Sequence, residues 1–336
     1  MQYIHAIWGG RNYGVVRERM GYKSLLIYNP AAGPWDMRRP LKNLAGYLER
    51  YGWHMELVET QKAGDATEFA RQAALQGTDL VLAAGGDGTI NEVVNGVVGS
   101  RTMMSIIPVG TGNLLARQLR MPILSVADPF SVAETGDALL KGRVQRVDAG
   151  RANGRSFICW AGVGLDAEIA NYLEPRPKYI KHMRMIPYII AAFSVASEFQ
   201  GVKAKLSMEG RALNARALLI LASNIQLYAA FFTIARHAYM DDGMLDIFIF
   251  KGLGWPYALR HILYVFSGRY LRDPGIIQVL TRNLEIRTLP DVALQVDGEP
   301  IGATPVSISL DAASLSLLVP SQAPGDLFCK PPERVL

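Results

Sequence analysis

The stretch AAGGDGTINEVVNG, residues 83 to 96, decides the fold. An apolar run that begins at Asp79 ends in its glycines, and an apolar pattern with helical spacing follows directly. Glycine has no Cβ, so the backbone can bend freely and approach a ligand, and the N–H groups at a helix start attract anions. The stretch therefore predicts a strand, a phosphate-binding loop and a helix. A glycine-rich turn without a ligand is the alternative.

A second loop of this kind follows the next apolar run. The run MMSIIPVG, residues 103 to 110, leads into PVGTGN, residues 108 to 113, and a helical pattern begins there. Loops at the ends of adjacent parallel strands converge on one crevice. Neither loop has the Gly-Lys-Ser/Thr of a P-loop or the Gly-x-Gly-x-x-Gly of a dinucleotide enzyme, so those two nucleotide folds are disfavoured.

Asp87 lies inside the first glycine loop. A carboxylate there would repel phosphate unless it faced a metal ion or the hydroxyl that receives the phosphoryl group. Its presence therefore predicts bound Mg²⁺.

The surrounding sequence alternates strand and helix patterns, which indicates a three-layer α/β domain with a parallel sheet. SLLIYNP (24–30) and WHMELVET (53–60) are the first strands, and Asp65 is expected to cap the second helix. We predict that this domain covers residues 23–144, and the sequence leaves open whether the last strand and tail, about 314–336, return to it. Residues 1–22 form an N-terminal extension.

Residues 145–313 are predicted to form a second domain of antiparallel β structure, because closely spaced strand patterns follow one another. Helical patterns over Tyr179–Phe199 and Tyr257–Arg269 interrupt them. The predicted strands are FICWAGVG (157–164), AKLSME (204–209), ALLILASN (217–224), LDIFIFK (245–251), LEIRTL (284–289), VALQVDGE (292–299) and VSISL (306–310). A last predicted strand, SLSLLVP (314–320), begins the tail.

Composition narrows the class of protein. The 336 residues are 50% hydrophobic and 19% charged with a net charge of +5, a globular profile that gives nucleic acid binding little support. Two cysteines suit a reducing compartment, and residues 1–22 show no export signal, so we expect a cytoplasmic protein. The longest apolar stretch, Met185–Ala196, is shorter than the ~20 residues that span a bilayer.

Further motifs occur in a fixed order along the chain. They are Asn29-Pro30 with Gly33, Thr60 followed by Gly64-Asp65-Ala66, AGVGLDAEIA (161–170), MDDGMLD (240–246) and VDGEP (296–300). With these and the two glycine loops, the chain resembles the diacylglycerol kinase catalytic family nearly from end to end. That family includes bacterial lipid kinases, sphingosine kinases and ceramide kinase.

The resemblance implies a fold, two cofactors and a set of site residues. The fold is a phosphofructokinase- and NAD-kinase-like α/β domain plus an antiparallel β-sandwich, with ATP between them. Asp297 is implied as the base that takes the proton of a lipid hydroxyl, with Asp87 as a second catalytic residue. A structural Mg²⁺ is implied on Asp242 and the carbonyl oxygens of Tyr239 and Met244. The implied ATP-binding residues are Asn29, Pro30, Ala31, Ala32, Gly33, Thr60, Gly85, Gly86, Asp87, Gly88, Thr89, Ile90, Asn91, Glu92, Gly110, Thr111, Gly112 and Asn113.

Two departures from the family pattern concern the ligands. The family commonly has Ser-Gly where this chain has Ala32-Gly33, so backbone N–H groups must replace a hydroxyl. After the position of Asn224 the family often has a glycine run, and here Tyr228 to Phe232 stands instead. The bulk of these side chains bears on which lipid is accepted.

The predicted reaction transfers the γ-phosphoryl group of ATP to a lipid hydroxyl, with diacylglycerol as first choice. Phosphatidylglycerol and a sphingoid base remain open as acceptors, as do an NAD-kinase-like or phosphofructokinase activity and a non-catalytic lipid-binding role. Contact with the membrane is expected to be peripheral, and a homodimer is left open. Lys178, Lys181 and Arg184 begin an apolar stretch that suits either a core helix or a helix on anionic lipid.

Overall fold

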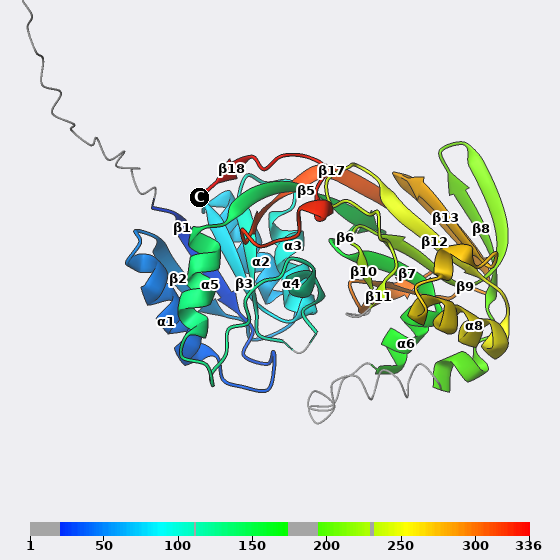
Figure 1. Cartoon of the computed structure of the whole chain (residues 1–336), viewed down its shortest axis with the longest axis horizontal. Coiled ribbons are helices and arrows are strands. Elements are labelled where there is room, and N and C mark those ends of the chain that lie inside the picture. Colours follow the sequence, from blue (N-terminus) through cyan, green and yellow to red (C-terminus); the bar gives the residue numbers. More distant parts are fainter. Residues whose placement is uncertain (1–20, 111, 174–193, 229–231) are drawn as a thin grey trace, which may run out of the picture.

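The structure, a computed structural model, describes residues 21–110, 112–173, 194–228 and 232–336. Most of the helix expected over Tyr179–Phe199 lies outside these residues, as do Lys178, Lys181 and Arg184. Two halves lie side by side (Figure 1). Hydrogen-bonded strands run continuously from one half into the other.

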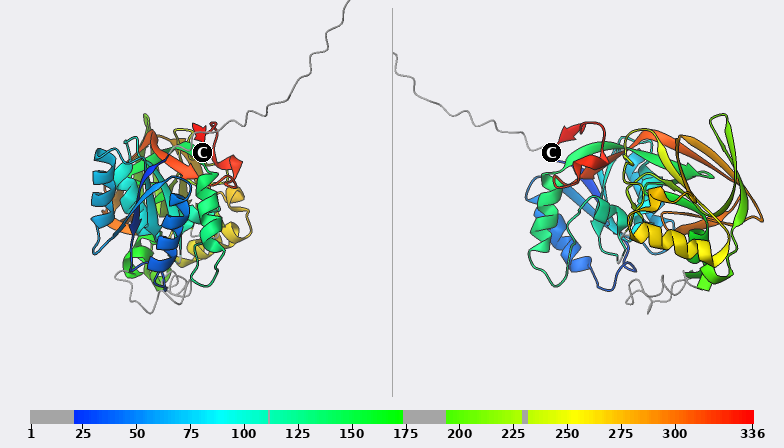
Figure 2. Two further views of the ribbon diagram at one scale, coloured as in Figure 1. Left: turned by 90° about the vertical axis from the view of Figure 1, so that its left-hand side faces the viewer. Right: turned by 45° about the vertical axis from the view of Figure 1, so that its right-hand side comes forward.

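The N-terminal half contains a parallel sheet of four strands in the order β4-β3-β1-β2. All residues of the two apolar runs β3 and β4 are buried, as expected for strands covered on both faces. Helices cover both faces of this sheet (Figure 2), and α2 packs on α3 while α1 packs on α5. The strands are β1 (Lys23–Tyr28), β2 (His54–Glu59), β3 (Leu80–Gly85) and β4 (Met103–Pro108), and the helices are α1 (Arg38–Glu49), α2 (Asp65–Leu75), α3 (Asp87–Val97), α4 (Leu114–Gln118) and α5 (Ser131–Leu140).

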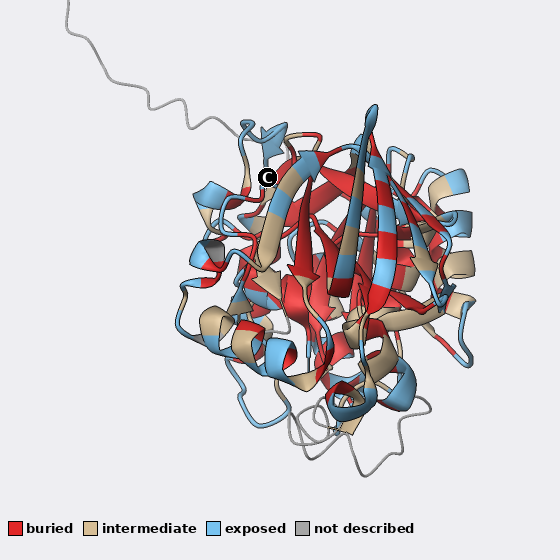
Figure 3. Cartoon of the chain, turned by 90° about the vertical axis from the view of Figure 1, so that its right-hand side faces the viewer, coloured by how far each residue is buried: buried red, intermediate tan, exposed pale blue. Residues whose placement is uncertain are grey.

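The C-terminal half is built from antiparallel strands, as the sequence predicts. Buried and exposed residues alternate along several of them (Figure 3), and β8 alternates strictly over its seven residues. The strands are β6 (Arg155–Phe157), β7 (Trp160–Gly164), β8 (Val202–Met208), β9 (Arg211–Ser223), β12 (Leu245–Lys251), β13 (Ile276–Thr281), β14 (Asn283–Leu289), β15 (Ala293–Val296) and β16 (Glu299–Ala303). The helices are α6 (Leu165–Leu173), α8 (Gly254–Phe266) and the 3₁₀ helix η2 (Tyr270–Arg272).

Two long strands, β5 (Arg143–Ala152) and β17 (Val306–Val319), connect the halves. The strands VSISL and SLSLLVP, expected to be separate, form the single strand β17, with a register shift between Asp311 and Leu315. One end of β17 pairs with β14 antiparallel and the other end pairs with β4 in parallel. The two halves therefore share backbone hydrogen bonds, which fixes the glycine loops of one half relative to the β15–β16 turn of the other.

Short elements complete the chain. Strands β10 (Leu227–Tyr228) and β11 (Phe232–Thr233) form a separate antiparallel pair, η3 (Gly325–Leu327) is a 3₁₀ turn, and β18 (Arg334–Val335) pairs with β5. Within the described ranges, none of the helices combines the length and the apolar character needed to cross a bilayer.

Candidate active site

The two glycine loops meet, as the sequence predicts for adjacent strand ends. A Cβ added to Gly110 would lie 2.7 Å from the Cα of Gly86, so the loops touch backbone to backbone. The loop after β1 joins them: Gly33 has φ +71°, and a Cβ there would lie 2.1 Å from the carbonyl oxygen of Val109. Asn29 Nδ2 donates to Thr89 Oγ1 at 3.0 Å. The loops after β1, β3 and β4 therefore form one assembly.

Gly86 is the residue immediately before α3, and its backbone is ordinary. Its φ of −88° and ψ of −175° are open to most residues, so this position does not require glycine for its backbone angles. A Cβ added to it would meet no described atom within 4 Å. The space next to the start of α3 is therefore open, and no described side chain caps that helix. An anion can occupy such a position.

Asp87 connects the first glycine loop to the second. Its Oδ1 accepts the backbone N–H of Leu114 at 2.7 Å, at the start of α4, and a Cβ added to Gly112 would lie 2.6 Å from its Oδ2. Asn113, with φ +50°, donates from Nδ2 to the carbonyl oxygen of Gly110 at 2.7 Å. The Asp87 carboxylate therefore lies between the two loops. Thr111 lies outside the described residues.

Glu92 holds the loop that precedes α2. Its carboxylate accepts the N–H of Gly64 at 2.9 Å and the N–H of Ala66 at 3.1 Å. The expectation that Asp65 caps α2 is wrong, because its carboxylate accepts the N–H groups of Gln61 and Lys62, which precede the helix. Glu92, which lies on the neighbouring helix α3, thus caps α2 and positions the segment that begins at the buried Thr60.

Asp297 lies in the turn between β15 and β16 with φ +48°, and its carboxylate is buried. Four donors surround it: the N–H groups of Ile158 at 3.0 Å, Cys159 at 2.9 Å and Trp160 at 3.0 Å, and Asn91 Nδ2 at 2.9 Å. Burial raises the pKa of this carboxyl, and the donors oppose that rise. A carboxylate offers about four acceptor positions. Asp297 can therefore take a proton only when one of these donors moves away.

Asn91, on α3, forms several hydrogen bonds with residues of the other half. Its Nδ2 also donates to the carbonyl oxygen of Ser156 at 2.9 Å, and its Oδ1 accepts Nη2 of Arg155 at 3.1 Å. Arg155 pairs in turn with Glu299, and a Cβ added to Gly88 would lie 2.1 Å from Oε1 of Glu299. The helix behind the first glycine loop is thus bound directly to the hairpin that carries Asp297.

Asp166, at the start of α6, is a second carboxylate near the turn; the residue is partly exposed, its Oδ1 is buried, and the sequence predicted no role for it. Its Oδ2 accepts Gln295 Nε2 at 2.8 Å and the Tyr228 hydroxyl at 3.3 Å, whereas its buried Oδ1 has no hydrogen-bond partner in the described chain. Burial raises its pKa to about 6. Gln295 also accepts the N–H of Gly298, which links Asp166 to the turn after Asp297. The AGVGLDAEIA motif contains Asp166 and was the signal that could have found it. The partners of its carboxylate, Gln295 and Tyr228, lie far away in the sequence.

The implied structural Mg²⁺ site is the turn formed by Tyr239, Asp242 and Met244. Asp242 Oδ1 accepts the N–H of Met244 at 2.9 Å. Burial, and then the charges of Asp148 and Asp241, raise the pKa of Asp242, and a divalent cation would relieve this repulsion. Among described residues, three or more His, Cys, Asp or Glu side chains nowhere form a metal-binding group. The implied set has one carboxylate and two carbonyl oxygens, which suits a hard cation.

Comparison with known proteins agrees with this geometry. The model of the diacylglycerol kinase catalytic domain matches residues 23–152, and that of the YegS C-terminal NAD kinase beta sandwich-like domain matches residues 160–319. A diacylglycerol kinase of Staphylococcus aureus (strain bovine RF122 / ET3-1) is 30% identical over 291 residues, which cover 86% of this chain and 89% of the relative. The chain belongs to the diacylglycerol kinase family.

Other relatives extend this result to the whole fold. A diacylglycerol kinase of Bacillus subtilis (strain 168) is 28% identical over 285 residues, which cover 84% of this chain and 91% of that protein. The crystal structure of a candidate diacylglycerol kinase from Bacillus anthracis str. Sterne superposes with a TM-score of 0.75 and 26% identity, over 90% of this chain and 97% of that one. The protein is thus a lipid kinase of this family and uses ATP, and the matches do not favour an NAD kinase or a non-catalytic lipid-binding protein.

Proposed function

We propose that this kinase phosphorylates the free hydroxyl of diacylglycerol and forms phosphatidate. The hydroxyl oxygen attacks the γ-phosphorus of ATP, the bond from that phosphorus to the β–γ bridging oxygen breaks, and ADP leaves. The observation that carries the proposal is the hydrogen bond between Asn91 and Asp297, because it joins the glycine-loop helix to a buried carboxylate of the other half.

The nucleotide is assigned to the three joined loops. The open position next to Gly86 and the start of α3 suits the phosphates, and Asn29 to Gly33, Thr60 and Gly110 to Asn113 complete the implied ATP site. Asp87 is the candidate ligand of a catalytic Mg²⁺, which when bound neutralises charge on the transferring phosphoryl group. A second Mg²⁺ is assigned to Asp242 with the carbonyl oxygens of Tyr239 and Met244.

Asp297 is assigned as the group that takes the hydroxyl proton. Since its four donors saturate the carboxylate, we expect the bound acceptor to displace one of them, and Asn91 Nδ2 is the only side-chain donor of the four. The three backbone donors are held in place by the chain. Asp166 lies near the same turn through Gln295 and is a candidate to orient the acceptor.

The acceptor is identified by incubating the protein with labelled ATP, Mg²⁺ and mixed micelles that each contain one lipid. Labelled phosphatidate from diacylglycerol is the expected product. Label on phosphatidylglycerol or a sphingoid base, with none on diacylglycerol, would overturn this assignment and would leave the lipid kinase activity in place.

Lipid access is proposed to occur at the cytoplasmic face of a membrane through peripheral contact. Lys178, Lys181 and Arg184 remain candidates for that contact, and changing all three to Gln should weaken binding to anionic vesicles without changing ATP affinity.

A homodimer is also proposed for testing, and sedimentation velocity distinguishes it from a monomer.

A further inference from the structure

Helix α8 exposes a stripe of large apolar side chains. Leu259 and Ile262 are each 39% exposed and Leu263 is 59% exposed, at a spacing that places them on one face of the helix. Ala258 and His261 lie outside this stripe and are buried. An apolar outward face is unusual for a helix on the surface of a globular protein, where that face is normally polar.

Two polar side chains of α8, Arg260 and His261, contact other parts of the protein. His261 Nδ1 contacts Asp273 Oδ2 at 2.9 Å and His261 Nε2 contacts the carbonyl oxygen of Lys251 at 2.7 Å. Arg260 pairs with the buried Asp273. These contacts hold α8 against the loop before β13, so the apolar stripe is fixed in its outward orientation.

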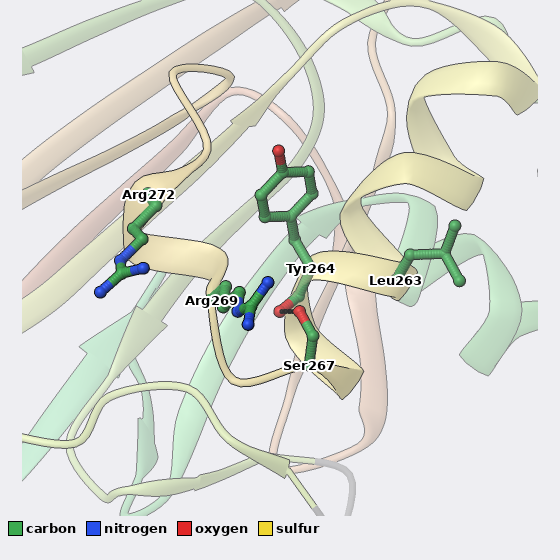
Figure 4. A pocket seen from close by; sticks show the side chains of 5 residues that line it. All are labelled: Leu263, Tyr264, Ser267, Arg269 and Arg272. Carbon is green, nitrogen blue, oxygen red and sulfur yellow. Dashed lines mark hydrogen bonds between the residues drawn. The ribbon is translucent and has the colours of Figure 1, made fainter.

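Positive charge lies at the end of the stripe. Leu263, Tyr264, Ser267, Arg269 and Arg272 line a pocket of about 450 Å³ (Figure 4). Arg269 and Arg272 are exposed, and exposed Arg236 lies beside Gly268, where an added Cβ would be 2.8 Å from its Nη2. The sequence contains no Asp or Glu from Gly252 to Arg272. The pocket therefore suits an anion, next to an apolar surface.

We propose that α8 docks the kinase on an anionic bilayer, with the stripe of Leu259, Ile262 and Leu263 at the acyl boundary and the pocket of Arg269 and Arg272 on phospholipid phosphates. A surface that combines an apolar helix face with arginines matches the interface of such a bilayer in both polarity and charge. A second copy of the chain fits less well, because a two-fold contact would bring the same arginines together. The proposal rests on the proposed function, since that function requires access to a lipid.

Vesicle sedimentation without ATP tests the apolar stripe. Leu263→Gln should weaken binding to phosphatidylcholine vesicles containing phosphatidylglycerol by about 10-fold, because the leucine side chain no longer transfers into the lipid. Leu75→Gln is the matched control, since Leu75 is 75% exposed at the end of α2 in the other half, and it should bind like wild type. Equal binding by the Leu263 variant and wild type would overturn the role of α8.

The charge is tested by Arg269→Gln/Arg272→Gln. Each arginine near an anionic surface contributes roughly 5-fold, so this variant should bind about 25-fold more weakly, and its binding should depend less on salt. Arg39→Gln/Arg101→Gln removes two exposed arginines of the N-terminal half and should change nothing. Equal losses in both double variants would indicate only net charge and would overturn the assigned pocket.

Two further measurements separate this proposal from its alternatives. Turnover of a dispersed short-chain diacylglycerol should stay at the wild-type level in the α8 variants, because this substrate needs no bilayer. If the wild-type protein binds vesicles but phosphorylates no diacylglycerol, the proposed function is contradicted and the docking surface is not. If sedimentation velocity shows a dimer that Leu263→Gln dissociates while vesicle binding persists, the stripe binds a second copy and the bilayer assignment is wrong.

Discussion

Asn91 Nδ2 donates to Asp297 Oδ2 at 2.9 Å, although 206 positions separate the two residues in the chain. One residue belongs to the helix that follows the first glycine loop and the other to a turn in the antiparallel half. Both side chains are buried, so the hydrogen bond is shielded from water. The hydrogen bond therefore links the helix that follows the first glycine loop directly to the carboxylate proposed as the base.

Asp297→Asn should lower turnover by ~10²-fold or more and leave ATP binding largely intact, because the amide keeps the size of the side chain but cannot take the proton. The structure adds a second effect. The amide NH₂ group must face a backbone N–H that the carboxylate now accepts, which should lower the free energy of unfolding by about 1–3 kcal/mol.

Steady-state kinetics, ATP titration calorimetry and urea unfolding measure these effects separately. Asp291→Asn is the matched control, since Asp291 is exposed six residues earlier, and it should behave like wild type. Near-normal turnover of the Asp297 variant would remove this residue from the mechanism.

Gly86→Val should abolish ATP binding in a protein that still folds. The valine side chain would occupy the open space assigned to the phosphates, and the extended backbone at Gly86 admits it. Loss of the glycine at the helix start should cost no more than about 1 kcal/mol. Calorimetric titration with ATP and Mg²⁺ and a thermal melt are the measurements.

Gly110→Ala provides the contrast, because its Cβ would lie 2.7 Å from the Cα of Gly86 and should destabilise the fold itself. If Gly86→Val folds and binds ATP with unchanged affinity, the phosphates lie elsewhere.

Glu92→Ala should destabilise the protein by about 1–2 kcal/mol and weaken ATP binding as a secondary effect. The change leaves the N–H groups of Gly64 and Ala66 without their carboxylate and frees the loop that follows Thr60. Urea unfolding measures the loss of stability. Glu49→Ala, at an exposed position at the end of α1, is the control. Equal stability of the two variants would mean that the Glu92 carboxylate does not hold the loop.

Asp166 should make the stability of the protein depend on pH. Burial raises its pKa to about 6 from an ordinary value of 3.8, so the folded state binds its proton more tightly than the unfolded state does. The favourable contribution of Asp166 to the free energy of unfolding is therefore complete below about pH 4 and is lost as the pH rises through about 6. The change corresponds to roughly 3 kcal/mol between those limits.

Asp166→Asn has no such proton to lose, so its stability relative to wild type should rise between pH 4 and pH 7. Urea unfolding of both proteins across this range measures the difference. A constant difference would show that Asp166 titrates in the folded protein as it does in the unfolded chain.

The parallel half was predictable from the sequence because its signals are local. An apolar run of six to eight residues, glycines and a helical pattern follow one another between Asp79 and Gly96, and each part depends on its neighbours in the chain. The convergence of the loops after β3 and β4 was also predictable, because adjacent parallel strands end at one edge of the sheet. The structure confirms both.

Backbone conformation and side-chain partners at the site were decided by tertiary structure. Glycine permits many backbone angles, so its presence at position 86 does not reveal that φ is −88°, an angle that most residues adopt. Aspartate is a common helix-capping residue, so Asp65 was expected to cap α2. In the structure, Glu92 of the packed helix α3 accepts the N–H of Ala66 at the start of α2. Competition between a local and a distant acceptor cannot be read from local sequence.

The sequence by itself determined the strand–loop–helix order, the apolar runs that become β3 and β4, and the family to which the motifs belong. Tertiary structure alone decided that VSISL and SLSLLVP form one strand through both halves, and that Asn91, Asp166 and Gln295 gather around the turn of Asp297. The physical reason is that local propensity acts over a few residues, whereas a buried carboxylate takes its hydrogen bonds from whichever donors the folded chain brings to it.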